Sequence, residues 1–150
     1  MGRLDKDSSG LILLTSDGRL PNSALRSNRK QPKVYEVFVD GPGVREEHLQ
    51  RLRDGIVITT VAQRDQKSKS LTAKTLPCKV ERIGLYGLQI TLVEGRNRQI
   101  RRMLDALGYR VRELHRVQFM GISLDPLQGP GEWEALGDKD MRVLANVLVP

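Results

Sequence analysis

The sequence contains one cysteine and two histidines among its 150 residues. The single cysteine, Cys78, excludes an internal disulfide and a zinc site built from cysteines. We interpret it as a small apolar residue at the start of a strand, in a protein of a reducing compartment. The histidines, His48 and His115, are far apart and neither has a metal-ligand spacing around it. His48 is expected on a helix surface, and His115 as a packing or hydrogen-bonding residue.

Long hydrophobic runs are also missing. No apolar segment approaches the ~20 residues that a membrane helix needs, and no signal peptide is visible. Neither a Walker-type phosphate loop nor a dinucleotide fingerprint occurs. Aromatic residues make up 4% of the chain, which is too few for a platform that stacks several RNA bases. One base held against one ring, as in base-flipping enzymes, remains compatible with this composition.

Basic residues are plentiful. The formal net charge is +7 and the isoelectric point is near 9.9, which favours a polyanionic partner. The arginines lie within segments that have the pattern of helices and strands, so the charge does not belong to a detachable tail. The length of the chain predicts one domain, and no internal repeat or linker divides it.

The hydrophobic pattern predicts several strands with interspersed helices, many of them joined by short turns. We expect strands at 11–14, 33–40, 56–61, 78–83, 88–93, 109–114 and 117–123, with a hairpin between 78–83 and 88–93. Helices are expected over 44–53 and 97–107 and from Asp138 onwards, a surface helix or loop over 19–31, a mobile loop over 62–75 that RNA could order, and an extended piece over 133–136. This order predicts a mixed, mainly antiparallel α+β fold.

The stretch GRLDKDSSGLILLTSDG, residues 2–18, places Asp5 in a polar loop directly before an apolar run. A rigid scaffold can hold a carboxylate in a fixed direction at such a place. Three carboxylates lie around this run, Asp5, Asp7 and Asp17, and a metal-dependent nuclease is one interpretation. We favour a lone catalytic carboxylate backed by an arginine, because Lys6 separates the first two and Asp17-Gly18 is explained as a turn.

The stretch EGRNRQIRRMLDALGYRVRELHR, residues 94–116, contains seven arginines and no lysine. Its apolar residues recur at helical spacing over 97–107, and Arg98, Arg101, Arg102 and Asp105 fall on the opposite face. A solvated ridge with an Arg101–Asp105 pair is one explanation, but it would be worth only ~0.3–0.5 kcal/mol. The use of arginine alone favours a surface that binds carboxylate or phosphate.

These motifs resemble those of the pseudouridine synthases. Residues 2–18 resemble the central motif of that family, Lys33-Val34-Tyr35 its second motif, and residues 94–116 its third. The run NRQIRRM, residues 97–103, has the form of the RsuA-like branch, whereas the RluA-like branch has a Thr-His pair where Asn97-Arg98 stand. The resemblance implies the pseudouridine synthase fold for residues 1–150, with a mainly antiparallel sheet flanked by helices and loops.

The resemblance also implies roles for particular residues. Asp5 would be the catalytic aspartate, Tyr35 would pack on the flipped uracil and act near C5, and Arg101 would pair with Asp5. Residues implied to bind RNA are Arg3, which would displace the target base, and Lys33, Arg96, Arg98 and Arg102.

The implied reaction is isomerisation of a uridine in ribosomal RNA, with cleavage of the glycosidic bond, rotation of the base and rejoining through C5. Asp5 could add to C1′ or remove the 2′ proton, and neither route needs a cofactor or a metal. We expect a monomer in the cytoplasm of a bacterium, or in an organelle. The alternative is a non-catalytic RNA-binding or ribosome-assembly domain that has kept the fold.

The sequence departs from the family pattern in two places. Most RsuA-like enzymes carry an N-terminal S4 domain, and their catalytic fold begins with a strand bearing Asn-Lys-Pro; residues 1–150 are expected to lack both. Ser27-Asn28 also stand where a His-Pro pair is frequent. A weakened or absent activity is therefore expected for this stretch of chain by itself.

Overall fold

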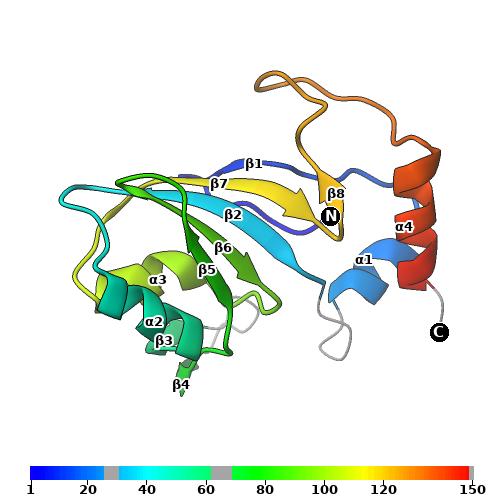
Figure 1. The fold of residues 1–150 in the computed structure, drawn as a ribbon. Helices are drawn as coiled ribbons and strands as arrows, with labels where there is room; N and C mark the ends of the chain where they lie inside the picture. The colour runs from blue at the N-terminus through cyan, green and yellow to red at the C-terminus, as the bar shows by residue number, and fades with distance from the viewer. Residues whose placement is uncertain (26–30, 62–68, 149–150) are drawn as a thin grey trace.

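The computed structural model describes residues 1–25, 31–61 and 69–148, with two sheets and four helices (Figure 1). The main sheet has the order β1-β7-β2-β6-β5 with β8 beside β7, and β3 and β4 form a separate two-stranded ribbon. The strands are β1 Ser9–Gly10, β2 Lys33–Val39, β3 Val57–Val61, β4 Ser70–Lys74, β5 Lys79–Arg82, β6 Gly87–Leu92, β7 Val111–Phe119 and β8 Ile122–Ser123. The helices are α1 Arg19–Leu25, α2 Glu46–Asp54, α3 Gln99–Ala106 and α4 Asp138–Leu148.

Strand β2 lies at the centre of the main sheet. It pairs with β6 on one side and β7 on the other, both antiparallel. Alternation along β2 buries Val37 and Val39 on one face, whereas Glu36 and Phe38 face the other side and are half-buried. The predicted β5–β6 hairpin is confirmed, and only β1 pairs in parallel among the described strands. The prediction of a mainly antiparallel α+β fold is therefore confirmed.

Two hydrophobic clusters hold the described residues together. The first lies under α2 and α3, where Leu52 and Leu104 pack against the buried face of β2 and β6. The second lies at the other end of the sheet, where α1 and α4 pack on one another and around Phe119 (Figure 1). In the described ranges, none of the helices combines the length and the apolar character needed to cross a bilayer.

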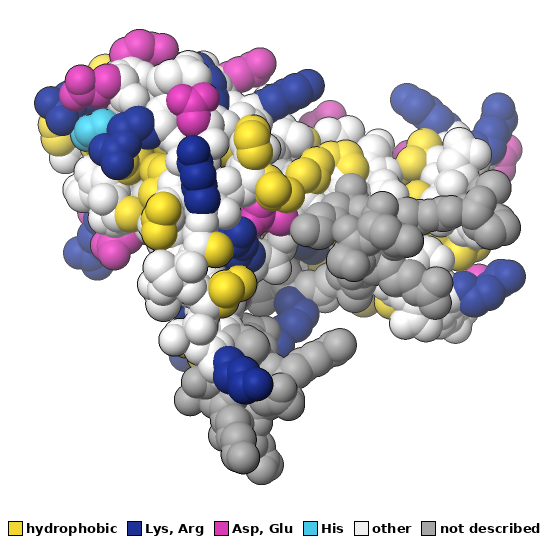
Figure 2. Space-filling model, turned by 90° about the horizontal axis from the view of Figure 1, so that it is seen from below, with side chains coloured by type: hydrophobic (Ala, Val, Ile, Leu, Met, Phe, Trp, Pro, Cys, Tyr) yellow, Lys and Arg dark blue, Asp and Glu magenta, His cyan; other side chains and the backbone are white. Residues whose placement is uncertain are grey.

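The charged side chains surround these cores. Seen from below, Lys and Arg side chains are spread over the face of the molecule, and Asp and Glu side chains gather mainly at one end (Figure 2). Part of that acidity lies on α2, which carries Glu46 and Glu47 in its first turn. The helix macrodipole is complemented by this arrangement, because Arg51 and Arg53 occupy the last turn.

The expected strand over 11–14 is wrong. The parallel pairing of β1 ends at Gly10, and one further hydrogen bond joins the Leu11 N–H to the Arg116 carbonyl at 2.8 Å. Leu11 and Leu13 are buried in the second cluster while Ile12 and Leu14 are exposed. The alternating burial over 11–14 therefore comes from an extended chain with one buried side, which has no neighbouring strand to pair with.

Two further expectations need correction. The chain over 109–123 forms one long strand, β7, and then turns at Met120-Gly121, where both residues have positive φ, into the short β8. The expected loop over 62–75 contains β4, whose side chains are almost all exposed, so its pattern lacks the alternation of a half-buried strand. Residues 62–68 of that loop lie outside the described residues, as do 26–30 of the expected surface segment.

Gly10 makes the close approach of β1 to β7 possible. Its φ is +112°, and a Cβ built there would lie 2.2 Å from the carbonyl oxygen of Arg116. We expect Gly10→Ala to lower the free energy of unfolding by about 2 kcal/mol or more, because both the backbone conformation and the strand contact must change. Gly18→Ala is the matched control, since a Cβ there meets nothing within 4 Å. Urea unfolding measures both, and equal stability of the two variants would contradict the expectation.

Candidate active site

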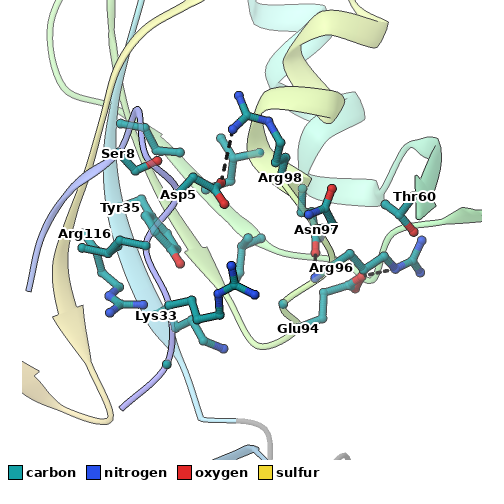
Figure 3. Close-up of a pocket in the computed structure, with 18 of the residues that line it drawn as sticks. Asp5, Ser8, Lys33, Tyr35, Thr60, Glu94, Arg96, Asn97, Arg98 and Arg116 are labelled. Atoms are coloured by element: carbon teal, nitrogen blue, oxygen red, sulfur yellow. Dashed lines mark hydrogen bonds and ion pairs between the residues drawn. The ribbon is translucent and has the colours of Figure 1, made fainter. Parts of the chain in front are cut away.

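An open cleft of about 820 Å³ lies between the loop before β1, the start of β2, the ribbon and the start of α3 (Figure 3). This volume is within the range of about 300–1,000 Å³ that is usual for ligand sites. The charged residues lining it are mainly basic: Arg3, Lys33, Lys69, Arg96, Arg98 and Arg116, against Asp5 and Glu94. A positively charged hollow with a carboxylate inside it suits a polyanion that must also undergo chemistry.

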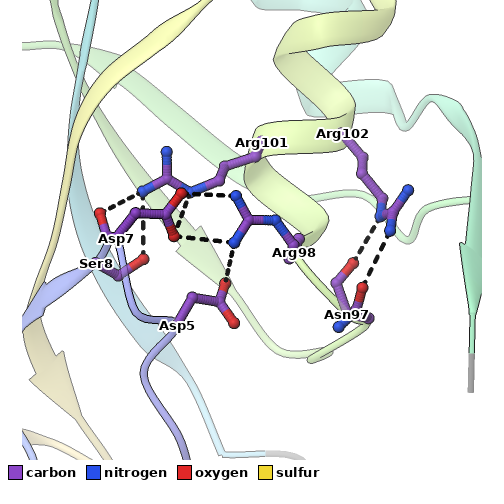
Figure 4. A network of polar contacts seen from close by, with 7 residues as sticks. All are labelled: Asp5, Asp7, Ser8, Asn97, Arg98, Arg101 and Arg102. Carbon is purple, nitrogen blue, oxygen red and sulfur yellow. Dashed lines mark hydrogen bonds and ion pairs between the residues drawn. The ribbon is translucent and has the colours of Figure 1, made fainter. Parts of the chain in front are cut away.

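Asp5 and Asp7 meet the same arginine, Arg98, across more than ninety residues of chain (Figure 4). Arg98 donates two hydrogen bonds to the Asp7 carboxylate, at 2.9 and 2.7 Å, in a bidentate pair. The same guanidinium lies 3.8 Å from the Asp5 carboxylate. Arg98 has φ of +50°, so the left-handed backbone before α3 directs its side chain toward this loop.

The implied pairing of Arg101 with Asp5 is not what the structure has. The Arg101 Nη2 atom donates to the Asp7 main-chain carbonyl at 2.7 Å and lies 3.4 Å from the Ser8 hydroxyl (Figure 4). Its Nε is 3.6 Å from the Asp7 carboxylate. One turn of α3 separates the two arginines, so Arg98, which precedes the helix, reaches the carboxylates and Arg101 supports the backbone of their loop.

Tyr35 points into the cleft from the start of β2 (Figure 3). It lies opposite Arg116 in the β2–β7 register. Burial raises the pKa of Tyr35, while its interaction with the nearby Arg116 guanidinium lowers it. The first effect is the larger, so Tyr35 stays a neutral phenol at neutral pH.

Arg116 also lines the cleft, and the sequence motifs gave it no role. Its side chain is only 1% exposed. It donates to the Leu11 carbonyl at 2.9 and 2.7 Å, and its guanidinium lies 5.0 Å from the centre of the Phe119 ring. The available signal was the period-2 pattern, which puts Arg116 on the same buried strand face as Leu114 and therefore demands a buried partner.

Three of the other residues predicted to bind RNA line the cleft, and Arg102 does not. Arg3 and Lys33 line the cleft, and Lys33 Nζ lies 5.6 Å from the centre of the Phe119 ring. Arg96 also lines the cleft, but its guanidinium is bonded to Glu94 and to β4. Arg102 is not among the lining residues and donates to the Asn97 carbonyl and side-chain oxygen, both at 3.1 Å.

The other titratable groups lie elsewhere. His48 is half-buried, where a surface position was expected, and its Nδ1 lies 2.6 Å from the Tyr109 hydroxyl. His115 is hydrogen-bonded to Ser9 at 2.7 Å, as expected. Cys78 is a partly buried thiol packed on the first cluster, and burial raises its pKa to about 11. In the part of the chain that the structure describes, no group of three or more His, Cys, Asp or Glu side chains could hold a metal ion.

The cleft thus combines a carboxylate beside an arginine, a half-buried tyrosine and a mainly basic lining. The sequence matches the family model for RNA pseudouridylate synthase over residues 1–106. The chain therefore belongs to the RNA pseudouridylate synthase family, which confirms the resemblance drawn from its three motifs. The expected fold is confirmed as well: a solved structure described as a pseudouridylate synthase superposes with a TM-score of 0.81 over 95% of this chain and 57% of the other, at 31% identity.

Similar curated proteins carry matching descriptions. The dual-specificity RNA pseudouridine synthase RluF of Escherichia coli K12 is 41% identical over 143 residues, which cover 94% of this chain and 44% of that protein. The ribosomal large subunit pseudouridine synthase E of Vibrio parahaemolyticus is 38% identical over 141 residues, covering 90% and 58% of the two chains. These relatives agree with the RsuA-like assignment. The chain spans about half the length of the curated relatives that it matches.

The Asp7–Arg98 pair predicts a pH dependence of stability. Hydrogen bonds from Arg98 lower the pKa of Asp7 from 3.8 to about 2. When the pKa of a carboxyl group is lower in the folded protein than in the unfolded protein, the group stabilises the fold at pH values above its pKa in the unfolded protein. This stabilisation is lost as the pH falls through its pKa in the folded protein. We expect the difference in free energy of unfolding between the wild type and Asp7→Asn to be constant from pH 7 to about 5 and to shrink between about 4 and 2.

Urea unfolding of both proteins across this range measures the difference. Asp17, whose pKa is also lowered to about 2 by Arg19, titrates in the same window. Because it is present in both proteins, its contribution cancels in the comparison. A difference that persists unchanged at pH 2 would contradict the assignment of the shift to Arg98.

Proposed function

We propose that this chain isomerises a uridine to pseudouridine in RNA, with ribosomal RNA as the substrate. The observation that carries the proposal is the placement of Asp5 within a basic cleft, close to Arg98 and on the same side as Tyr35. Membership of the family supports the reaction type, and the descriptions of the relatives support an RNA substrate. A monomer that acts on RNA belongs to the same proposal.

The reaction is an internal rearrangement. The bond between N1 of uracil and C1′ breaks, the base turns, and C5 joins C1′; C5 then loses its hydrogen and N1 gains a proton. Asp5 supplies the carboxylate that acts at C1′ or at the 2′ proton. Tyr35, held neutral by burial and facing Arg116, lies where a ring can pack on the turning base and handle the proton near C5. These steps use only side chains of the chain itself.

The target base must leave its stack before it can reach Asp5. Unstacking and unpairing cost a few kcal/mol. Phosphate contacts from the basic lining residues offset this cost, and Arg3 is well placed to occupy the gap because it lines the cleft just before Asp5. The scarcity of aromatic residues fits a site that holds one base rather than a run of stacked bases.

Asp5→Asn tests the catalytic role. We expect pseudouridine formation to fall by about 10³-fold or more while RNA affinity changes little, because the variant keeps its size and loses the reactive charge. Carbodiimide mapping of ribosomal RNA measures the product, and filter binding measures the affinity. Asp17→Asn is the control, since Asp17 pairs with Arg19 outside the cleft. RNA binding by the wild type with no new carbodiimide-reactive site would favour the non-catalytic alternative, and magnesium-dependent cleavage would favour the nuclease.

A second test separates the two arginines. Because Arg98 is the one near Asp5, we expect Arg98→Gln to lower the single-turnover rate at saturating RNA by about 10–100-fold. Arg101→Gln should cost less, since its main bond is to the Asp7 backbone. Arg51→Gln, on the exposed side of α2, is the control. Loss of turnover in Arg101→Gln with near-normal turnover in Arg98→Gln would restore the role that the family resemblance gave to Arg101.

A further inference from the structure

The ribbon of β3 and β4 forms one wall of the cleft, and β4 has little of the burial that attaches β3 to the core. Thr60, Val61, Lys69 and Leu71 of this segment line the cleft. Strand β3 buries Ile58 and Thr60, whereas β4 has no fully buried side chain. An isolated two-stranded ribbon is marginal in water, so its position depends on what ties it to the main body.

Glu94 and Arg96 provide such a tie for β4. The Arg96 guanidinium donates from Nη1 to the Ala73 carbonyl at 3.0 Å and from Nη2 to the Lys74 carbonyl at 2.8 Å. Its Nε lies 2.8 Å from the Glu94 carboxylate (Figure 3). A planar fork lets Arg96 donate to both carbonyls while its Nε faces the Glu94 carboxylate in an ion pair.

Glu94 completes the connection from the other side. It is 4% exposed, and its second carboxylate oxygen accepts a hydrogen bond from the Leu76 N–H at 2.7 Å, just beyond β4. A buried carboxylate needs a paired cation, and Arg96 is the cation beside Glu94. The position of Glu94 therefore restricts the position of the Arg96 guanidinium. The two residues also lie in the short loop that leads from β6 to Arg98, the arginine beside Asp5.

From this geometry we infer that Glu94 and Arg96 are positioning residues that hold the ribbon wall at a fixed distance from Asp5 and Arg98. This inference rests on the proposed function and changes one part of it, because Arg96 acts through the protein and does not serve as an RNA contact. The clamp sets the width of the cleft for the RNA strand and leaves the chemistry at the base to Asp5 and Tyr35.

The experiment compares Arg96→Lys with Arg53→Lys. Lysine keeps the charge next to Glu94 but lacks the fork that reaches both carbonyls. Arg53 is a matched control, because it is also partly buried and donates to a backbone carbonyl, that of Val80, away from the cleft. Glu94→Gln, which removes the buried charge, is the second variant of the clamp.

Two readouts are needed. Trypsin cleavage after Lys69 and Lys74 should be about tenfold faster in Arg96→Lys than in Arg53→Lys, because the ribbon opens more often. The KM for RNA should rise about tenfold, with the single-turnover rate at saturation within about threefold of the wild type. Glu94→Gln should change both readouts in the same direction.

Unchanged proteolysis in both clamp variants would overturn the inference. Faster proteolysis with an unchanged KM would also overturn it, since the clamp would then serve stability alone. A fall in the saturated rate with KM unchanged would place Arg96 in the chemistry instead. If the wild type forms no pseudouridine, the proposed function fails, but proteolysis and RNA affinity measured by filter binding still test the clamp.

Discussion

The attraction between the carboxylates of the loop before β1 and the arginines at the start of α3 is the constraint on which the site depends. It joins residues more than ninety positions apart. Arg98 contributes charge to both Asp5 and Asp7, while Arg101 holds the backbone at the Asp7 carbonyl. An exposed ion pair is usually weak, but a bidentate pair reinforced by a bond to the backbone fixes direction as well as distance.

The sheet supplies the second constraint. Register places Tyr35 opposite Arg116, and Gly10 allows the neighbouring strand to approach the Arg116 backbone closely. The Arg116 guanidinium donates twice to the Leu11 carbonyl and lies over the Phe119 ring. A buried arginine held in this way is rigid, so it gives Tyr35, which it faces in the strand register, a cationic neighbour in a fixed position.

Local pattern predicted much of this architecture. The sequence predicted helix α3, strand β2 and the hairpin of β5 and β6, because each has a periodic pattern set by one buried face. Pattern failed for β4, whose side chains are nearly all exposed, and for 11–14, where burial alternates without a neighbouring strand. Family motifs identified Asp5 and Tyr35 as site residues, and both line the cleft. They gave the pairing with Asp5 to Arg101, whereas Arg98 is the arginine that lies near Asp5, because the left-handed backbone at Arg98 directs its side chain toward the loop.

Asp5 is a negative charge in a cleft whose lining is mainly basic. A surface that only binds RNA gains affinity from each cation and loses it from each anion near the phosphates. Asp5 lies about one-third exposed in a basic hollow, where its charge opposes the approach of a phosphate backbone. Arg98 screens that repulsion without removing the carboxylate from reach. A carboxylate that lowers affinity and yet is kept in the cleft beside an arginine is better explained by chemistry at the bound nucleotide than by binding alone.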